Sequence, residues 1–243
     1  MASDPPLSPE ETRRYARHLV LKGMGGAGQQ KLKAARVLVV GAGGLGSPAI
    51  AYLAAAGIGR LGIADPDMVS LSNLQRQIVH AGADLGRNKA ENAGRFAAAL
   101  NPNVALDLIP KAIDADNAAG ILAAYDLVLD GTDNLATRRV VAAAAEHLRI
   151  PLVSGAVSMF SGQVTIFAPH LGGPSHDALF PPEASDDALP SCEANGVLGP
   201  VTGIIGALMA MEAVKLLAGI GEPLIGRLLV YDGREGRFSE LAY

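Results

Sequence analysis

Three glycines, at positions 41, 43 and 46, form the pattern G-x-G-x-x-G directly after the aliphatic run Arg36 to Val40. An Ala- and Leu-rich segment, Ser47 to Ala56, comes next and is typical of a helix. This order predicts a strand, a tight turn and a helix. Glycine lets a phosphate approach bare backbone N–H groups, and the positive end of a helix dipole also favours an anion. The stretch therefore predicts a nucleotide site without specifying the nucleotide.

A second apolar run, Leu61 to Ala64, ends in Asp65, which lies 24 residues after Gly41. An acid about 20 residues beyond the glycine turn, at the tip of the next strand, usually holds a ribose hydroxyl. Asp65 is therefore our candidate for the ribose contact.

Polar and charged side chains also follow later segments of the chain. In an open α/β sheet, ligands bind beyond the carboxyl ends of the strands, near the first strand. Taken singly, Arg76 and Lys89 are surface charges, and Asp133 could equally cap the following helix or hold a metal ion. Together they favour a polyphosphate site, because a hydride-transfer site needs little cationic charge beyond the glycine turn. The candidates are Asn73, Gln75, Arg76, Lys89, Asp130 and Asp133.

Composition excludes several classes of protein. The net charge of −4 provides no global basic field to attract nucleic acid or an anionic membrane, so we expect neither as a partner. A single cysteine, Cys192, excludes a disulfide within the chain and a cysteine-built zinc site. Residues 1–9 lack a signal pattern, and the apolar run Gly196 to Met211 is shorter than the roughly 20 residues of a membrane span. We expect a buried helix there and a cytoplasmic protein.

Strand and helix patterns alternate through the first two thirds of the chain. This alternation predicts an α/β fold with a Rossmann-like, doubly wound, mostly parallel sheet. Expected helices cover residues 8–22, 47–56, 86–100, 114–124, 135–148 and 197–217. Expected strands cover residues 36–40, 61–64, 104–109, 126–129, 152–154, 163–167, 228–231 and 238–241, the last two as an antiparallel C-terminal hairpin.

Residues 169–196 form a long connection with five prolines, five acids and neither lysine nor arginine. Such a connection is typical of a lid, a binding loop or a disordered segment. At the other end of the chain, Arg13, Arg14 and Arg17 share one side of the first expected helix, and the residues alone favour a solvated basic face.

Five segments resemble one family: G-A-G-G-L-G, D-P-D-x-V-x-L-S-N-L-Q-R-Q, G-R-N-K, L-D-G-T-D-N and S-G-A-V-S-x-F-x-G-Q-V-T. They are similar to the ThiF/MoeB/HesA adenylyltransferases, bacterial relatives of ubiquitin-activating enzymes. The resemblance runs from Leu7 to Leu241. It implies one ATP-binding domain over residues 1–243: an N-terminal helical arm (1–35), a nucleotide-binding half (36–160) and a carrier-binding half (161–243) with a mobile loop (169–196).

The implied reaction is adenylation of the C-terminal glycine of a ubiquitin-like sulfur-carrier protein, of the ThiS or MoaD type and ending in Gly-Gly. It would consume MgATP and release pyrophosphate, in thiamine or molybdopterin biosynthesis. The implied catalytic residues are Arg17, Arg76, Lys89, Asp133 and Cys192, with Asp133 holding Mg²⁺ and Arg17 acting from the partner subunit of a homodimer. The implied nucleotide-binding residues are Gly41, Gly43, Gly44, Gly46, Asp65, Ser72, Asn73, Gln75, Arg76, Lys89, Asp133 and Asn134.

This reaction needs no general base, because a terminal carboxylate with a pKa of about 3.5 is ionised at neutral pH. We therefore interpret the five histidines, at 18, 80, 147, 170 and 176, as structural or surface residues. Cys192 occupies the place of a loop cysteine that some relatives use for a covalent sulfur linkage, and a free thiol is the alternative.

One departure from the family concerns zinc. Family members commonly carry two C-x-x-C pairs, but here Ser175 and Ala178 stand at the first pair, and the sequence ends at Tyr243 before the second. We therefore expect no structural zinc and a more mobile 169–196 loop.

Three other functions stay open at this point. The glycine motif alone fits an NAD- or FAD-dependent oxidoreductase. The fold alone fits a non-catalytic interaction protein. Within the superfamily, an enzyme activating a tRNA-bound carboxylate is also conceivable, although the acidic balance disfavours a tRNA partner. The sequence identifies neither the carrier and its pathway nor the sulfur donor.

Overall fold

The structure is a computed structural model that describes residues 5–181 and 196–243, so Cys192 lies outside the described residues. Within these ranges the strands are β1 (Arg36–Val40), β2 (Arg60–Ala64), β3 (Ala105–Ile109), β4 (Leu127–Asp130), β5 (Leu152–Ser158), β6 (Ser161–Phe167), β7 (Arg227–Asp232) and β8 (Arg237–Ala242). The α-helices are α1 (Pro9–Arg14), α2 (Ala16–Leu19), α3 (Gly25–Ala34), α4 (Gly46–Ala56), α5 (Lys89–Leu100), α6 (Ala118–Leu122), α7 (Leu135–His147) and α9 (Gly199–Ala218).

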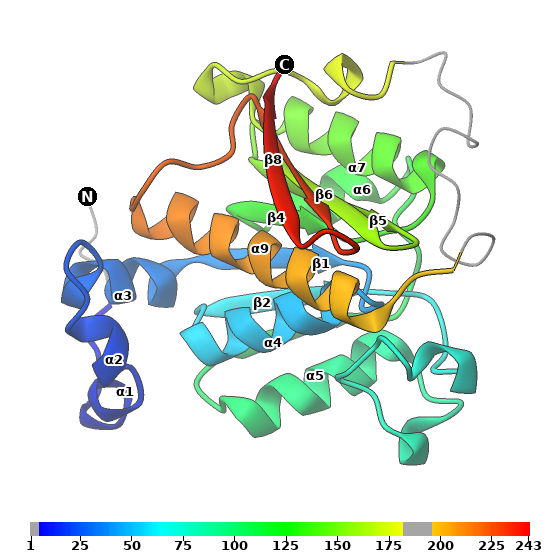
Figure 1. Ribbon diagram of the computed structural model, residues 1–243. Coiled ribbons are helices and arrows are strands. Elements are labelled where there is room, and N and C mark those ends of the chain that lie inside the picture. Colours follow the sequence, from blue (N-terminus) through cyan, green and yellow to red (C-terminus); the bar gives the residue numbers. More distant parts are fainter. Residues whose placement is uncertain (1–4, 182–195) are drawn as a thin grey trace.

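All of these strands belong to one sheet with the order β3-β2-β1-β4-β5-β6-β7-β8. The strands from β3 to β5 in this order are parallel to one another, whereas β6, β7 and β8 each join antiparallel to their neighbours. The predicted parallel sheet with a C-terminal antiparallel extension is confirmed (Figure 1). The order reverses beside β1, and β4 lies directly next to it.

The central strand β1 is buried on both faces. Val37 and Val39 belong to one apolar cluster, which includes residues of α4, α5 and α9. Leu38 and Val40 point to the opposite face and join a second cluster with residues of α6 and α7. Figure 1 shows α4, α5 and α9 in front of the sheet and α6 and α7 behind it. Burial on both faces explains why β1 reads as a continuous aliphatic run.

Helix α9 is the one helix among the described residues that is long and apolar enough to cross a membrane. Half of its apolar window is buried in the protein. Its Gly206 lies so close to α4 that a β-carbon there would be 2.3 Å from the carbonyl oxygen of Leu45. This packing agrees with the predicted buried helix.

The N-terminal arm differs from the single helix expected over residues 8–22, because the chain breaks at Tyr15 between α1 and α2. The Tyr15 side chain is buried against Gly57, and its hydroxyl accepts a hydrogen bond from Asn101 Nδ2 at 2.8 Å. Helix α3 was not expected, because its first two residues are the poor helix formers Gly25 and Gly26. Burial of Leu32 and Gln29 stabilises it in the folded protein.

Helix α6 covers five residues instead of the eleven expected over 114–124. The carboxylate of Asp114 accepts hydrogen bonds from the backbone N–H groups of Asp116 and Asn117, both at 3.0 Å. These bonds hold residues 114–117 in a turn, because a short polar side chain competes with the helix for backbone donors.

Candidate nucleotide site

The glycine turn connects β1 to α4, as predicted. Gly41 has a φ of +93°, which glycine adopts without strain. At Gly46 the reason is space, since a β-carbon there would lie 1.8 Å from the carbonyl oxygen of Gly41. The turn therefore requires glycine at both positions, for different reasons.

We expect Gly46→Ala to destabilise the fold by about 1–3 kcal/mol or more, because overpacking forces the turn to open. Gly120→Ala is the matched control: a β-carbon at Gly120, in α6, meets nothing within 4 Å. That substitution should stabilise by about 0.5–1 kcal/mol through helix propensity. Urea unfolding of both variants measures the difference, and equal stabilities would contradict the turn geometry.

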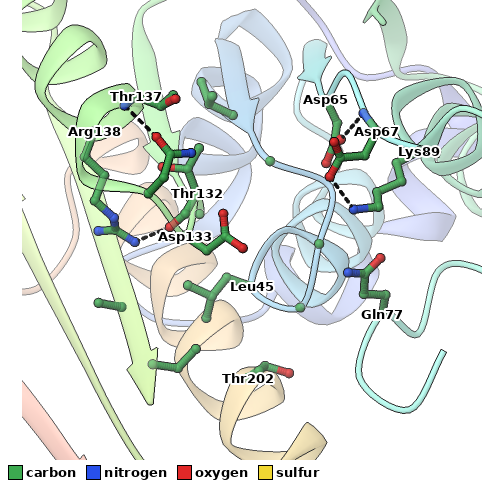
Figure 2. A pocket seen from close by; sticks show the side chains of 18 of the residues that line it. Leu45, Asp65, Asp67, Gln77, Lys89, Thr132, Asp133, Thr137, Arg138 and Thr202 are labelled. Carbon is green, nitrogen blue, oxygen red and sulfur yellow. Dashed lines mark hydrogen bonds and ion pairs between the residues drawn. The ribbon is translucent and has the colours of Figure 1, made fainter. Parts of the chain in front are cut away.

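A cavity of about 430 Å³ opens at the carboxyl ends of β1 and β4, beside the glycine turn. It is bounded by the turn, by the segment after β2, by the start of α5 and by the turn after β4 (Figure 2). The residues predicted for the site that line this one cavity are Gly41, Gly43, Gly44, Asp65, Asn73, Arg76, Lys89, Asp133 and Asn134.

Other predicted site residues are not among those lining the cavity. Gly46 is the first residue of α4 and follows the turn in the chain. Ser72, within the 3₁₀ turn η1 (Leu71–Asn73), and Gln75, two residues after it, are exposed. The N–H groups of Arg76 and Gln77 both bond to the carbonyl oxygen of Asn73, so the chain makes a helical turn here. Residues 73, 76 and 77 share the cavity side of that turn, and residues 72 and 75 face away.

Arg17 lies on α2 and is exposed. In Figure 1, α2 is near the start of β1, whereas the cavity lies beyond the end of that strand. Arg17 is therefore far from the cavity of its own chain.

Asp65 supports the glycine turn from the tip of β2. Its Oδ2 accepts a hydrogen bond from Ala42 N at 2.8 Å, and its Oδ1 accepts one from Asp67 N at 2.9 Å. Burial raises the pKa of the carboxyl, while the charge of Lys89 and the two N–H donors oppose this rise. Each carboxylate oxygen keeps a lone pair with which it can accept a hydroxyl proton.

Lys89 is the first residue of α5, and Asn88 caps that helix by accepting a hydrogen bond from Glu91 N. The amide of Asn88 donates to the carbonyl oxygen of Asp65, which ties the start of α5 to the end of β2. The Lys89 side chain is 8% exposed, and its Nζ lies 2.8 Å from Asp67 Oδ2, whose side chain is 64% exposed. A buried cation thus faces the cavity with a solvated counter-ion.

The turn after β4 is held by a buried acid and a buried guanidinium. Asp130 Oδ1 accepts hydrogen bonds from both the N–H and the hydroxyl of Thr132. Arg138, on α7, donates to the carbonyl oxygens of Thr132 and Gly155 and lies 3.6 Å from Asp130 Oδ2. The turn that carries Asp133 is therefore held in place by buried hydrogen bonds to Asp130 and Arg138.

Helix α7 is capped by Asn134, whose Oδ1 accepts from Thr137 N at 2.8 Å. Asp133 is not the cap, so that alternative is wrong. Its exposed carboxylate lines the cavity, and no hydrogen bond or ion pair joins it to the described residues. An unpaired carboxylate in a cavity beside a glycine turn has the chemistry of a Mg²⁺ ligand, because Mg²⁺ binds through one or two carboxylates together with substrate phosphates.

No group of three or more His, Cys, Asp or Glu side chains that could hold a metal ion occurs in residues 5–181 and 196–243. Ser175 directly precedes the 3₁₀ turn η4 (His176–Ala178), and Ala178 is its last residue; the turn packs against aromatic rings. The His176 ring lies 5.2 Å from that of Phe167 and 4.9 Å from that of Phe180. Burial lowers the pKa of His176, which favours its neutral form. The absence of structural zinc stays a prediction.

Several residues that line the cavity are not predicted by the sequence. Arg138 was within an expected helix, where periodicity does not reveal a buried arginine. Gln77 is the last residue of the segment D-P-D-x-V-x-L-S-N-L-Q-R-Q. Without knowledge of the helical turn after Asn73, the sequence does not show that its side chain faces the cavity. Residues of β5, β6 and α9 extend the wall away from the turn. The missed residues include Asp67, Gln77, Lys111, Thr132, Arg138, Ser158, Ser161, Gln163 and Thr202.

The fold is of the Rossmann type, and its cavity lies at the β1/β4 switch point, where proteins of this architecture bind nucleotides. Comparison of the sequence with protein families matches residues 15–243 to the ThiF family. The chain belongs to the ThiF family, which confirms the resemblance found in its motifs.

Two relatives and one solved structure illustrate this similarity. The chain is 47% identical over 232 residues to "Probable adenylyltransferase/sulfurtransferase MoeZ" of Mycobacterium tuberculosis, covering 94% of this chain and 59% of that one. It is also 47% identical to "Sulfur carrier protein adenylyltransferase" of Thermus thermophilus, over 96% of this chain and 87% of that one. The structure of E. coli MccB with ATP has a TM-score of 0.82 at 22% identity, over 94% of this chain and 71% of that one, and supports the fold.

Proposed function

We propose that this protein adenylates the C-terminal carboxylate of a small ubiquitin-like sulfur-carrier protein, using ATP and releasing pyrophosphate. The observation that carries the proposal is the placement of Arg76, Lys89 and Asp133 around one cavity at the glycine turn. The Thermus relative, which is covered over 87% of its length, is named for the same reaction. The chain spans 59% of the mycobacterial relative, so any sulfur-transfer step lies outside the proposal.

Charge supports a triphosphate over a dinucleotide. Arg76 and Lys89 both line the cavity, and only Lys89 has an acidic partner there. Arg76 donates to the carbonyl oxygen of Ser72 at 3.2 Å, which leaves most of its guanidinium donors for a ligand. A unit charge at about 4 Å contributes on the order of 4 kcal/mol at an effective dielectric of about 20. Two such cations favour the binding of a polyanion.

In the proposed reaction, a carboxylate oxygen of the carrier attacks the α-phosphorus of ATP. The new bond joins that oxygen to phosphorus, and the bond from phosphorus to the bridging oxygen breaks as pyrophosphate leaves. No proton moves, so no base is needed. Lys89 and Arg76 would hold the phosphates in line and stabilise charge as it develops. Asp133 would hold Mg²⁺, which neutralises phosphate charge when bound.

The far wall of the cavity suits an extended glycine tail. Ala156 and Ser158 of β5, Ser161 and Gln163 of β6 and Val230 of β7 line it, and none of them is charged. We infer that the carrier tail lies along this wall with its carboxylate toward the glycine turn.

Arg17 would complete the site from a second copy of the chain. Its place at the opposite end of β1 supports this assignment, because it lies far from the cavity of its own chain (Figure 1). A homodimer that places α2 of one subunit at the cavity of the other would bring the arginine to the phosphates.

The test is exchange of labelled pyrophosphate into ATP, dependent on a carrier ending in Gly-Gly. Asp133→Asn should lower this exchange at least about a hundredfold, because a neutral amide is a much weaker ligand for Mg²⁺ than a carboxylate. Asp116→Asn, which neutralises an exposed acid outside the cavity wall, is the control. Absence of exchange with every such carrier would reject the function, and full activity of Asp133→Asn would reject that role alone.

A further inference from the structure

The glycine turn is held from behind by a buried histidine. His80 is 7% exposed and is not among the residues that line the cavity. Its Nε2 lies 3.0 Å from the carbonyl oxygen of Ala42, which is inside the turn. The N–H of Ala42 already donates to Asp65 Oδ2 at 2.8 Å. The peptide groups on both sides of Ala42 are therefore bonded to buried side chains.

The neighbours of His80 determine which of its ring nitrogens carries the proton. Arg95 has only donors, so the atom of Asn92 that its Nη2 contacts must be the amide oxygen. The amide nitrogen of Asn92 therefore faces His80 Nδ1, at 2.8 Å, and donates to it. Since Nδ1 accepts, the proton of the neutral ring is on Nε2, which donates to Ala42. Arg95 is itself bonded to Asp84 Oδ1 at 2.7 Å, so a directed chain of hydrogen bonds runs from a surface ion pair to the glycine turn.

The charges around the ring are consistent with its neutral form. Burial is the largest influence and lowers the pKa of His80, and the charge of Lys89 lowers it further. The hydrogen bond to Ala42 and the charge of Asp84 act in the opposite direction, and the pKa stays below its usual value. At neutral pH the ring therefore has one N–H to donate.

The bond to Ala42 also determines the direction of the next backbone N–H group. In a trans peptide, the C=O of one residue and the N–H of the next point in opposite directions, and the described residues contain no cis peptide. Because the carbonyl of Ala42 points to His80, the N–H of Gly43 points away from it. Gly43 lines the cavity, and its N–H bonds to no described residue. This N–H is a donor available to a ligand.

We propose that His80 is a positioning residue for nucleotide binding: its Nε2–H holds the peptide between Ala42 and Gly43 so that the Gly43 N–H faces an acceptor oxygen of the bound nucleotide. The inference rests on the proposed function, because it takes the ligand to be ATP. Glycines stand on both sides of Ala42, and glycine restricts backbone rotation least, so this peptide needs an external bond to fix it. A donor that is already oriented binds without the cost of ordering it.

The first experiment locates the ring proton in the full chain by the ¹⁵N chemical shifts of the imidazole nitrogens at pH 7. The signals that disappear in His80→Gln belong to His80. We expect a proton on Nε2 and none on Nδ1. A proton on Nδ1, alone or in addition, would overturn the proposed chain of hydrogen bonds.

The second experiment measures MgATP binding to the full chain by calorimetry, without carrier. His80→Leu keeps an apolar side chain of similar size and removes the donor, so it should weaken MgATP binding about tenfold. His80→Gln restores an N–H donor at about the position of Nε2 and should bind within about threefold of the wild type. His147→Leu is the control, because His147 is exposed on α7 and is not among the residues lining the cavity. It should bind as the wild type does.

Rescue by glutamine separates positioning from packing. Equal losses of affinity in folded His80→Leu and His80→Gln would indicate a packing role and overturn the inference, and so would unchanged affinity in His80→Leu. A wild type that binds no MgATP rejects the proposed function and the role of His80 with it. Failure of the inference alone leaves wild-type binding of MgATP intact.

Discussion

Lys89→Met should reduce pyrophosphate exchange by about a thousandfold and leave the protein folded. The ammonium group is a buried cation in the cavity wall, with a side chain that is 8% exposed. A charge contribution on the order of 4 kcal/mol at an effective dielectric of about 20 corresponds to roughly three orders of magnitude in rate. Methionine keeps the length and most of the volume of the side chain, so the wall of the cavity is preserved.

The fold should tolerate this change because the ion-pair partner, Asp67, is solvated, and because the buried Asp65 carboxylate keeps its two backbone N–H donors when the charge of Lys89 is lost. Asp67 is 64% exposed, so water replaces the ammonium group that it loses. Exchange kinetics and a thermal melt measure the two effects separately. Lys22→Met, which removes an exposed cation outside the cavity wall, is the control. More than a tenth of wild-type exchange in Lys89→Met would contradict the assigned role.

The sequence predicts the part of the site that follows directly from local sequence patterns, namely the glycine turn and Asp65. The glycine turn and Asp65 follow aliphatic runs, and the positions of β1 and β2 could be predicted because strands buried on both faces are continuously apolar. Once the strand order is doubly wound, β4 must lie beside β1, which brings Asp133 to the turn. The strand order therefore brings motifs that are distant in the sequence together around one cavity.

The sequence does not show which side chains turn inward in irregular segments. Gln75 and Gln77 have the same side chain two residues apart, and only the helical turn after Asn73 distinguishes them. The helix break at Tyr15 depends on the packing of its ring against Gly57. This is a tertiary contact, which the helical periodicity of the sequence does not reveal. Arg138 is similar, because a buried arginine and a surface arginine look alike on an amphipathic helix.

Arg138→Met should destabilise the fold by about 3–5 kcal/mol, because it leaves a buried acid without its cation. Arg138 and Asp130 have side chains that are 3% and 1% exposed, and Asp130 Oδ2 has no hydrogen-bond partner. The guanidinium also bonds the carbonyl oxygens of Thr132 and Gly155, which would become unpaired. Chemical denaturation measures the loss.

Arg36→Met is the matched control, since Arg36 forms an ion pair with Asp126 that is shorter but exposed. Arg36 Nη2 lies 2.6 Å from Asp126 Oδ1, and the two side chains are 48% and 40% exposed. Solvent screening limits such a pair to about 0–1 kcal/mol. Equal losses in Arg138→Met and Arg36→Met would show that burial of the first pair has no energetic consequence.

A double-mutant cycle with Asp130→Asn separates the charge pair from the other bonds of Arg138. If the charges are coupled, the double variant should be more stable than the sum of the single losses by about 0.5–3 kcal/mol. Exchange activity should fall in Arg138→Met even where the protein remains folded, because the turn that carries Asp133 loses its anchor to β5. A folded Arg138→Met with wild-type exchange would mean that the turn keeps its shape without that anchor.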